Sequence, residues 1–182
     1  MRGLYPKQNA ITEPYVQKVN TMTHLETLIA EYLEWQGFLV MKNRKVGKLK
    51  HGGWEMELDI IGYSPESNEL VHYEPSTDAN AWDKRESRYI KKFQAGRKYI
   101  LSELFPWLKA APTLQQFGVF VTHPKNRHQI AGGTIISIDE LMATIREKVV
   151  ARGKMSKNAI PEQYPLLRTL QLSHSGYYGV VK

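Results

Sequence analysis

Residues 54–93, WEMELDIIGYSPESNELVHYEPSTDANAWDKRESRYIKKF, place two apolar runs, a turn and a basic segment in immediate succession. In the first run apolar residues alternate with acidic ones, which predicts a strand with a carboxylate-bearing face. The turn-forming residues 64–68 and the run 70–74 predict the second strand of a hairpin. If the two strands pair regularly, Asp59 in the first and Glu74 in the second meet near one end of the sheet.

A long helix is expected next, over residues 80–105, and Pro106 helps to end it. At about 100° per residue its apolar positions fall on one stripe, formed by Trp82, Tyr89, Phe93, Ile100 and Leu104. Three lysines lie nearly opposite this stripe and should face water, namely Lys84, Lys91 and Lys98. Lys92 instead lies at the border of the stripe, so its long side chain can reach across the sheet edge.

The segments around this stretch predict further helices and strands. The sequence THLE at 23–26 has the spacing of a capping box, and the helix that it begins continues until Gly37. Asp139 opens a last helix. Strands are predicted over the segments 38–41, 117–122 and 134–138. This order predicts an α/β fold in which helices cover the faces of a mixed sheet of about five strands.

The length of 182 residues favours one domain that is large enough to bury a core. We expect an N-terminal arm over residues 1–22, a core domain over residues 23–152, and an extension over residues 153–182 that packs on the core. The extension is expected to be irregular because it contains Pro161 and Pro165.

Composition restricts the function classes. A formal charge of +7 and a pI near 9.5 indicate an anionic partner such as nucleic acid, since clustered Lys and Arg release counterions from a phosphate backbone. No segment approaches about 18 consecutive apolar residues, so no membrane contact is expected. The lack of cysteine excludes thiolate chemistry and is compatible with the cytoplasm, which is the expected location. Glycine-rich phosphate loops and helical zinc motifs are absent from the sequence.

Two basic segments outside the long helix are candidates for contact with a phosphate backbone, one over residues 42–51 and the other over residues 123–133. Their candidate nucleic-acid-binding residues are Lys45, Lys48, Lys50 and Arg127. For the first segment, a solvated edge of the sheet is the alternative interpretation.

The candidate residues follow a recognisable order along the chain. It consists of an acid at Glu26 in the first helix, ELD at 57–59, a hairpin to YEPS at 73–76, and a long helix after it. Over about residues 23–150 the chain resembles the restriction-endonuclease-like PD-(D/E)XK nucleases. The branch with Mrr-type endonucleases and Holliday-junction resolvases is the most similar. The resemblance implies a three-layer α/β/α restriction-endonuclease-like fold and hydrolysis of DNA phosphodiester bonds with bound Mg²⁺ or Mn²⁺.

The resemblance also implies roles for individual residues. Asp59 and Glu74 correspond to the two acids that bind the metal, and Glu26 to the acid often supplied by the first helix. The family's lysine should stand where this chain has Ser76. Some members place that lysine on the following helix, and Lys92 is the candidate for such a migrated lysine.

The residue types suit this chemistry. Mg²⁺ is a hard cation that prefers a few carboxylate oxygens together with water and phosphate oxygens. A lysine near the metal would orient or help to deprotonate the attacking water. Arg88, one turn before Lys92, could contact the scissile phosphate, and Arg85 would add a further contact to the nucleic acid. An arginine does not easily act as a base, because guanidinium essentially never loses its proton.

Structural interpretations stand beside these roles. Glu26 also fits its capping box, Lys92 also fits a solvated or phosphate-contacting lysine, and Ser76 also fits a helix cap together with Thr77 and Asp78. Because the motif lysine is missing, the alternative function is a catalytically inactive nuclease-like module for nucleic-acid binding or assembly. A homodimer and recruitment by a partner protein are both compatible with the sequence.

Overall fold

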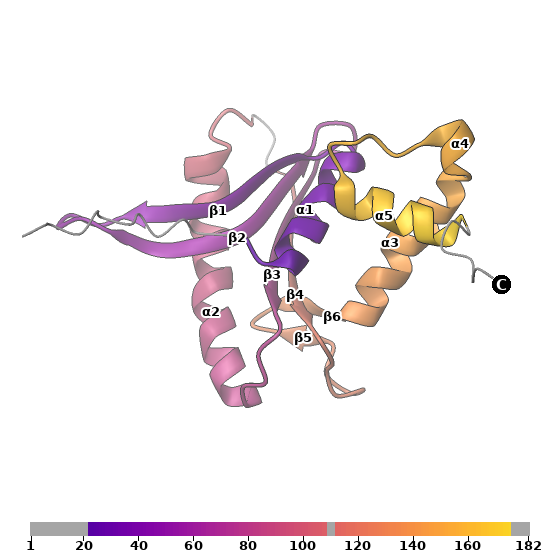
Figure 1. Ribbon diagram of the computed structural model, residues 1–182. Coiled ribbons are helices and arrows are strands. Elements are labelled where there is room, and N and C mark those ends of the chain that lie inside the picture. The colour runs from indigo at the N-terminus through magenta and orange to yellow at the C-terminus, as the bar shows by residue number, and fades with distance from the viewer. Residues whose placement is uncertain (1–21, 109–111, 176–182) are drawn as a thin grey trace, which may run out of the picture.

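The computed structural model describes residues 22–108 and 112–175. Within them, a six-stranded mixed sheet lies between helices on both of its faces (Figure 1). The α/β class and the mixed sheet expected from the sequence are confirmed. The expected number of five strands is wrong, because the segment 123–133 contains the two-residue strand β5 (Gln129–Ile130). Apart from Met22, the expected N-terminal arm lies outside the described residues.

The other strands are β1 (Leu39–Lys48), β2 (Trp54–Ser64), β3 (Glu69–Ser76), β4 (Leu114–Phe120) and β6 (Gly133–Ser137). Their order across the sheet is β1-β2-β3-β4-β6-β5. The first three strands pair antiparallel, β4 and β6 continue the sheet parallel to β3, and β5 pairs antiparallel with β6 at the far edge. The strand β1 is much longer than expected, since it includes most of the basic segment 42–51.

Helices α1 (His24–Trp35), α3 (Ile138–Arg152) and α5 (Pro165–His174) pack on one face of the sheet, and α2 (Trp82–Tyr99) packs on the other (Figure 1). The long helix expected over residues 80–105 is α2 followed by a π-helical segment, η1 (Ile100–Leu104). Among the described residues, no helix is long and apolar enough to cross a membrane.

The strand β2 contributes to the core on both faces of the sheet. Ile60 packs with α1, α3 and α5, whereas Leu58 and Ile61 pack on the side of α2. The sequence predicted Leu58 and Ile60 on the same face of β2. In the structure they lie on opposite faces, so the alternation of side chains breaks at Asp59. At this point of the ladder Asn43 of β1 falls opposite Asp59, and its backbone is left-handed with a φ of 49°. The irregularity lies at the position of the predicted metal ligand.

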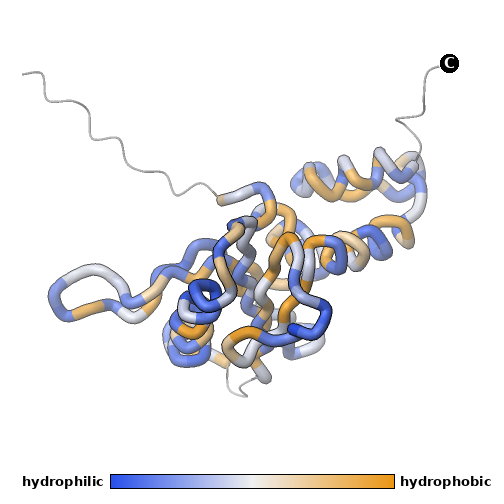
Figure 2. Tube along the Cα trace, turned by 90° about the horizontal axis from the view of Figure 1, so that it is seen from below, coloured by the Kyte–Doolittle hydropathy of each residue, from blue (hydrophilic) through white to orange (hydrophobic). Residues whose placement is uncertain are grey.

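Strands β2 and β3 separate at the same position. Their antiparallel register ends at the pair Ile60–Tyr73. Beyond it, β3 continues beside β4 as far as Ser76, while β2 continues with β1 into a hairpin that projects from the body (Figures 1 and 2). We call this point of separation the fork. Asp59 and Glu74 are the first residues beyond the last pair, one on each branch.

The C-terminal segment packs on the core, but the expectation of an irregular chain is wrong. It forms α4 (Met155–Asn158) and α5, and Pro165 stands at the start of α5, where a helix needs no N–H. The buried Glu31 carboxylate of α1 accepts hydrogen bonds from the backbone N–H groups of Leu166 and Leu167. Burial raises the pKa of Glu31, although these two bonds oppose the shift.

Candidate active site

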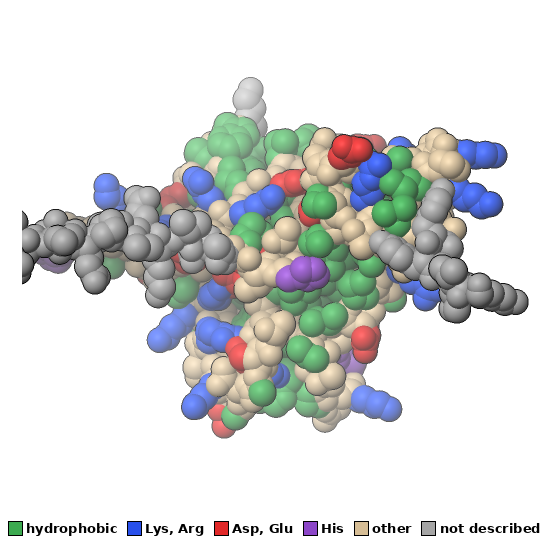
Figure 3. All heavy atoms as spheres, viewed as in Figure 1, with side chains coloured by type: hydrophobic (Ala, Val, Ile, Leu, Met, Phe, Trp, Pro, Cys, Tyr) green, Lys and Arg blue, Asp and Glu red, His purple; other side chains and the backbone are tan. Residues whose placement is uncertain are grey.

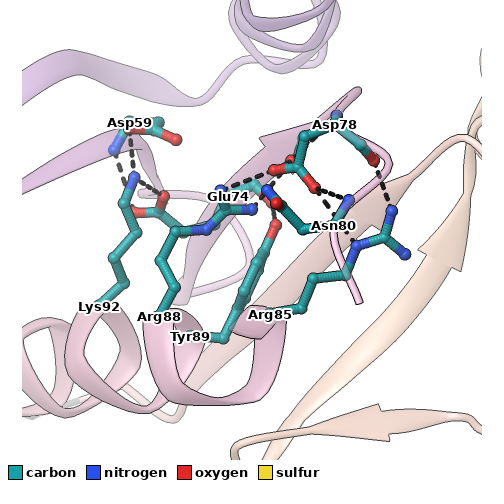
Figure 4. Close-up of polar contacts among 9 residues, drawn as sticks. Asp59, Glu74, Asp78, Asn80, Arg85, Arg88, Tyr89 and Lys92 are labelled. Atoms are coloured by element: carbon teal, nitrogen blue, oxygen red, sulfur yellow. Dashed lines mark hydrogen bonds and ion pairs between the residues drawn. The ribbon is translucent and has the colours of Figure 1, made fainter. Parts of the chain in front are cut away.

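Three charged side chains that the sequence analysis singled out lie together at the fork (Figure 4). Asp59 comes from β2, Glu74 from β3 and Lys92 from α2. They line a cavity of about 190 Å³, whose other lining residues are Pro75, Ser76, Arg88 and Tyr89. The fork, rather than a regular hairpin, brings the two carboxylates to the same cavity.

Lys92 bridges the two carboxylates. Its ammonium Nζ donates to Asp59 Oδ1 at 2.7 Å and makes a close ion pair with Glu74 Oε2. The Glu74 side chain is only 1% exposed and that of Lys92 is 19% exposed. Because water reaches this pair poorly, loss of the Lys92 charge would leave the Glu74 carboxylate buried without a counter-charge.

The side chain of Glu74 occupies the gap between the two branches of the fork. Its Oε1 accepts a hydrogen bond from the Asp59 backbone N–H at 3.2 Å and lies 2.8 Å from His72 Nε2. The Tyr89 hydroxyl donates to the Glu74 backbone carbonyl at 2.7 Å. The Glu74 carboxylate thus accepts a hydrogen bond from the backbone of β2. A backbone carbonyl of β3 would accept this bond if the β2–β3 ladder continued.

Burial and neighbouring charges shift the pKa values of the ionisable side chains at the site. Burial and the adjacent Glu74 carboxylate raise the pKa of Asp59 to about 7, against the opposing effect of Lys92. Burial alone would lower the pKa of Lys92, but the charges of Glu74 and Asp59 outweigh it and raise this pKa. Burial, followed by the charge of Lys92, lowers the pKa of His72 to about 3, so its imidazole is neutral.

Ser76 stands at the position where the sequence motif leads one to expect a lysine. It belongs to a polar cluster at the rim of the cavity. Its hydroxyl donates to Asp78 Oδ2 at 2.5 Å and accepts from Arg88 Nη2 at 2.9 Å, while Arg88 Nη1 donates to Asp78 Oδ2 at 2.6 Å. Burial works to raise the pKa of Asp78, but the hydrogen bonds from Ser76 and Arg88 outweigh it and hold this pKa well below its usual range. The Arg88 side chain is 40% exposed and has more N–H donors than these two bonds use.

The expected helix cap of Ser76, Thr77 and Asp78 is wrong. The N-cap of α2 is Ala81, which makes no side-chain cap bond. Asp78 instead contacts α2 from the side, through Arg88 and through Arg85, whose Nη2 donates to the Asp78 carbonyl at 2.5 Å.

Arg85 is held inside the protein, although the sequence suggested contact with nucleic acid. Its side chain is 10% exposed, and its guanidinium lies 4.9 Å from the ring centre of Trp82 and 5.0 Å from that of Phe120. These contacts favour a structural role, in which Arg85 attaches the start of α2 to the loop before it.

The structure does not bring Glu26 to the cavity. Its carboxylate accepts a hydrogen bond from the Thr23 N–H at 3.0 Å, and its own N–H donates to Thr23 Oγ1 at 3.3 Å. These contacts complete the capping box of α1. They correspond to the structural interpretation of Glu26 rather than to the catalytic one.

The other candidate cations lie on two separate elements. Lys45, Lys48 and Lys50 are exposed on the projecting hairpin formed by β1 and β2. Arg127 follows β4, where its Nη1 lies 3.3 Å from Glu86 Oε2 and its guanidinium lies 4.8 Å from the ring centre of Trp82. Contact of these residues with nucleic acid stays a prediction.

Among residues 22–108 and 112–175, no group of three or more His, Asp or Glu side chains is arranged to hold a metal ion. The oxygens of Asp59 and Glu74 nevertheless converge on one cation, the Lys92 ammonium. This donor pair fits a Mg²⁺ or Mn²⁺ ion that takes its remaining ligands from water and phosphate. Such an ion would compete with Lys92 for the same oxygens.

A buried amide behind the site was not predicted. Gln116 of β4 is 6% exposed, and its Nε2 lies 3.0 Å from His72 Nδ1 and donates to the Phe93 carbonyl at 3.1 Å. Its Oε1 accepts from Arg97 Nη1 at 2.6 Å. The only local signal was a glutamine pair inside an otherwise apolar strand, and that signal does not identify a partner.

Gly96 of α2 lies directly against this buried pair. A methyl group added at Gly96 would come within 2.7 Å of both Gln116 Nε2 and His72 Nδ1. Neither side chain can retreat at low cost, because both are buried and hydrogen-bonded. Gly96→Ala is therefore expected to lower the free energy of unfolding by about 1–3 kcal/mol, despite the higher helix propensity of alanine. Urea denaturation measures the change.

The exposed Gln94 in the same helix provides the control for this substitution. Gln94→Ala should change the free energy of unfolding by less than about 0.5 kcal/mol. A Gly96→Ala variant as stable as the wild type would be inconsistent with the close approach of α2 to His72.

A second and larger hollow lies on the opposite face of the sheet. Its volume is about 500 Å³, and apolar side chains gather around it where α1, α3 and α5 meet (Figure 3). Its lining includes Leu25, Leu28, Ile138, Met142, Leu166 and Leu170. This lining contains no Asp or Glu, in contrast to the cavity at the fork.

No family model matches this chain, and comparison with curated proteins found no similar sequence. The resemblance to PD-(D/E)XK nucleases therefore stays a prediction from the sequence motif.

Proposed function

We propose that this protein is a metal-dependent endonuclease of PD-(D/E)XK type that hydrolyses DNA phosphodiester bonds. The observation that carries the proposal is the meeting of Asp59, Glu74 and Lys92 in one small cavity. Two carboxylates come from adjacent strands, and the lysine comes from the helix that follows them. The helices on both faces of a mixed sheet are compatible with the three-layer α/β/α restriction-endonuclease-like fold, which is part of the proposal.

Each residue has a role in this proposal. Asp59 and Glu74 hold Mg²⁺ or Mn²⁺, which when bound would polarise the phosphate and lower the pKa of a coordinated water. Lys92 orients the attacking water and stabilises negative charge on the phosphate oxygens. Arg88, at the cavity rim, contacts the phosphate through its free donors. In the reaction the water oxygen loses a proton as it bonds to phosphorus, one P–O ester bond breaks, and the leaving oxygen takes up a proton.

Cleavage assays test the proposal directly. The protein is incubated with supercoiled plasmid, single-stranded DNA and branched DNA in the presence of Mg²⁺ or Mn²⁺. We expect cleavage of at least one substrate, and a rate at least about 100-fold lower for Asp59→Ala, because a single metal ligand is lost. The exposed Lys91→Ala should retain the wild-type rate. Cleavage that is absent in the wild type, or equal in Asp59→Ala, would overturn the proposal.

A second function is favoured by a separate observation, the contact of both carboxylates with the Lys92 ammonium. This pairing gives Asp59 and Glu74 a shared counter-charge without a metal. A catalytically inactive module that binds nucleic acid would need no more than this arrangement. Its basic hairpin would contact the phosphate backbone, and binding would weaken steeply as salt rises.

Calorimetric titration with Mg²⁺ separates the two functions. An enzyme should bind Mg²⁺ and lose this binding in Glu74→Gln. A binding module should instead bind DNA equally well with Mg²⁺ or with chelator, and should be unaffected by Glu74→Gln.

A further inference from the structure

A directed chain of hydrogen bonds leads from the outer side of α2 to the carboxylate of Glu74. Arg97 Nη1 lies 2.6 Å from Gln116 Oε1, Gln116 Nε2 lies 3.0 Å from His72 Nδ1, and His72 Nε2 lies 2.8 Å from Glu74 Oε1. Arg97 is exposed, whereas the other three side chains are buried. The chain therefore connects the surface to the innermost oxygen of the site.

The direction of each hydrogen bond in this chain is set by two groups with fixed roles, one that can only donate and one that can only accept. The Arg97 guanidinium can only donate, so the oxygen of the Gln116 amide faces it. The NH₂ group of Gln116 then faces the Phe93 carbonyl, which can only accept, at 3.1 Å. The same NH₂ group donates to His72 Nδ1, so Nδ1 carries no hydrogen. The hydrogen of the neutral imidazole is therefore on Nε2, which donates to Glu74 Oε1.

Packing prevents the imidazole from turning over. His72 is fully buried, and its ring meets Phe93 edge to face with ring centres 5.6 Å apart. On the side of α2, Gly96 lets the helix backbone approach so closely that there is no space for a methyl group. With the ring fixed, one hydrogen bond from Nε2 sets the rotation of the Glu74 carboxylate.

We propose that His72, held as the Nε2–H tautomer by Gln116, is a positioning residue for Glu74. It engages Oε1 together with the Asp59 N–H, and this leaves Oε2 directed at the cation, which in the structure is the Lys92 ammonium. The catalytic consequence rests on the proposed nuclease function. The tautomer and the carboxylate orientation do not depend on it.

Nitrogen-15 NMR of the histidine ring tests the tautomer in the intact protein. In the wild type we expect the signals of an Nε2–H imidazole at His72, assigned by their loss in His72→Gln. Gln116→Glu keeps the side-chain volume and the contact with Arg97, but it presents an oxygen to Nδ1. In that variant we expect a hydrogen on Nδ1. A wild-type ring with hydrogen on Nδ1, or a Gln116→Glu ring without it, would overturn the inference.

Mg²⁺ affinity tests the effect on Glu74. His72→Gln retains an N–H donor that can reach Oε1, whereas His72→Phe keeps a ring of similar size without a donor. We expect Mg²⁺ affinity about 10-fold lower or worse in His72→Phe, and at least partly restored in His72→Gln. Lys91→Ala serves as the matched control, and circular dichroism verifies that each variant is folded. The positioning role would be contradicted if the His72→Phe and His72→Gln variants had equal Mg²⁺ affinity. It would also be contradicted if both variants were folded and both lost Mg²⁺ binding.

The two proposals fail in different ways. A protein that shows the expected tautomer and Mg²⁺ affinities but cleaves no DNA would contradict the nuclease function and support the positioning of Glu74. A protein that cleaves DNA with the opposite tautomer would contradict the positioning role alone.

Discussion

Replacing Lys92 with methionine is expected to lower the free energy of unfolding by about 3–5 kcal/mol at pH 8 and to abolish DNA cleavage. The substitution keeps most of the side-chain volume but removes the ammonium that lies between Asp59 and Glu74. Two buried carboxylates then face each other without a counter-charge. At pH 5 the loss should be smaller, because a proton on one carboxyl can replace the missing cation.

Mg²⁺ should stabilise Lys92→Met more than it stabilises the wild type. In the variant no ammonium competes for the oxygens of Asp59 and Glu74, so the ion binds more tightly and the gain in stability is larger. Thermal unfolding at pH 8, with and without Mg²⁺, measures both effects. Lys91→Met, which alters the neighbouring exposed lysine, should leave stability and cleavage nearly unchanged. A Lys92→Met variant as stable as this control would refute the buried bridge.

Asp59→Asn should make the protein more stable and inactive, and the gain in stability should depend on pH. The pKa of Asp59 is raised from 3.8 to about 7 in the folded protein, so between these values the folded state binds more protons than the unfolded chain. The carboxyl therefore lowers stability progressively as pH rises from about 4 to about 7, and the loss is complete above pH 7. The amide does not ionise. We expect a gain of about 4 kcal/mol at pH 8 and little gain at pH 4.

Denaturation of Asp59→Asn and the wild type across this pH range measures the difference. Asp139→Asn, at an exposed position in the first turn of α3, is the control and should show no such trend. Two results would contradict the raised pKa of Asp59. One is a difference in stability between Asp59→Asn and wild type that stays constant from pH 4 to pH 8, and the other is an Asn variant that is less stable than wild type at pH 8.

Local patterns in the sequence predicted the parts of the fold and of the site that depend on local structure. The capping box at Thr23 and the apolar stripe of α2 follow from residue spacing alone. Helical phase separated Lys92 from the solvent-facing Lys91, and the structure places its ammonium on both carboxylates. The π-helical end of α2 comes after Lys92, so it does not disturb this phase.

The remaining parts depend on contacts between distant segments. Gln116 reaches His72 only through the parallel register of β3 and β4, in which these two residues are directly paired. That register depends on the crossover through α2, and no local pattern encodes it. Asp78 lies in a loop, and its position depends on Arg88 in the following helix. The helix α5 was missed because Pro165 suggested an irregular chain, although proline is well suited to the first turn.

The separation of β2 from β3 makes the length of the hairpin independent of the charged cluster at its base. The register that fixes Asp59 lies on the body side of the fork, from Ile60 to Ser64. On the outer side, the hairpin is attached to η1 up to Gly47, whose N–H donates to Glu103 Oε2 at 3.1 Å. Residues 49–53 at the tip can therefore be shortened, lengthened or exchanged while both carboxylates keep their places. Evolution or an engineer can diversify the surface of this tip without moving the three charged side chains at the fork.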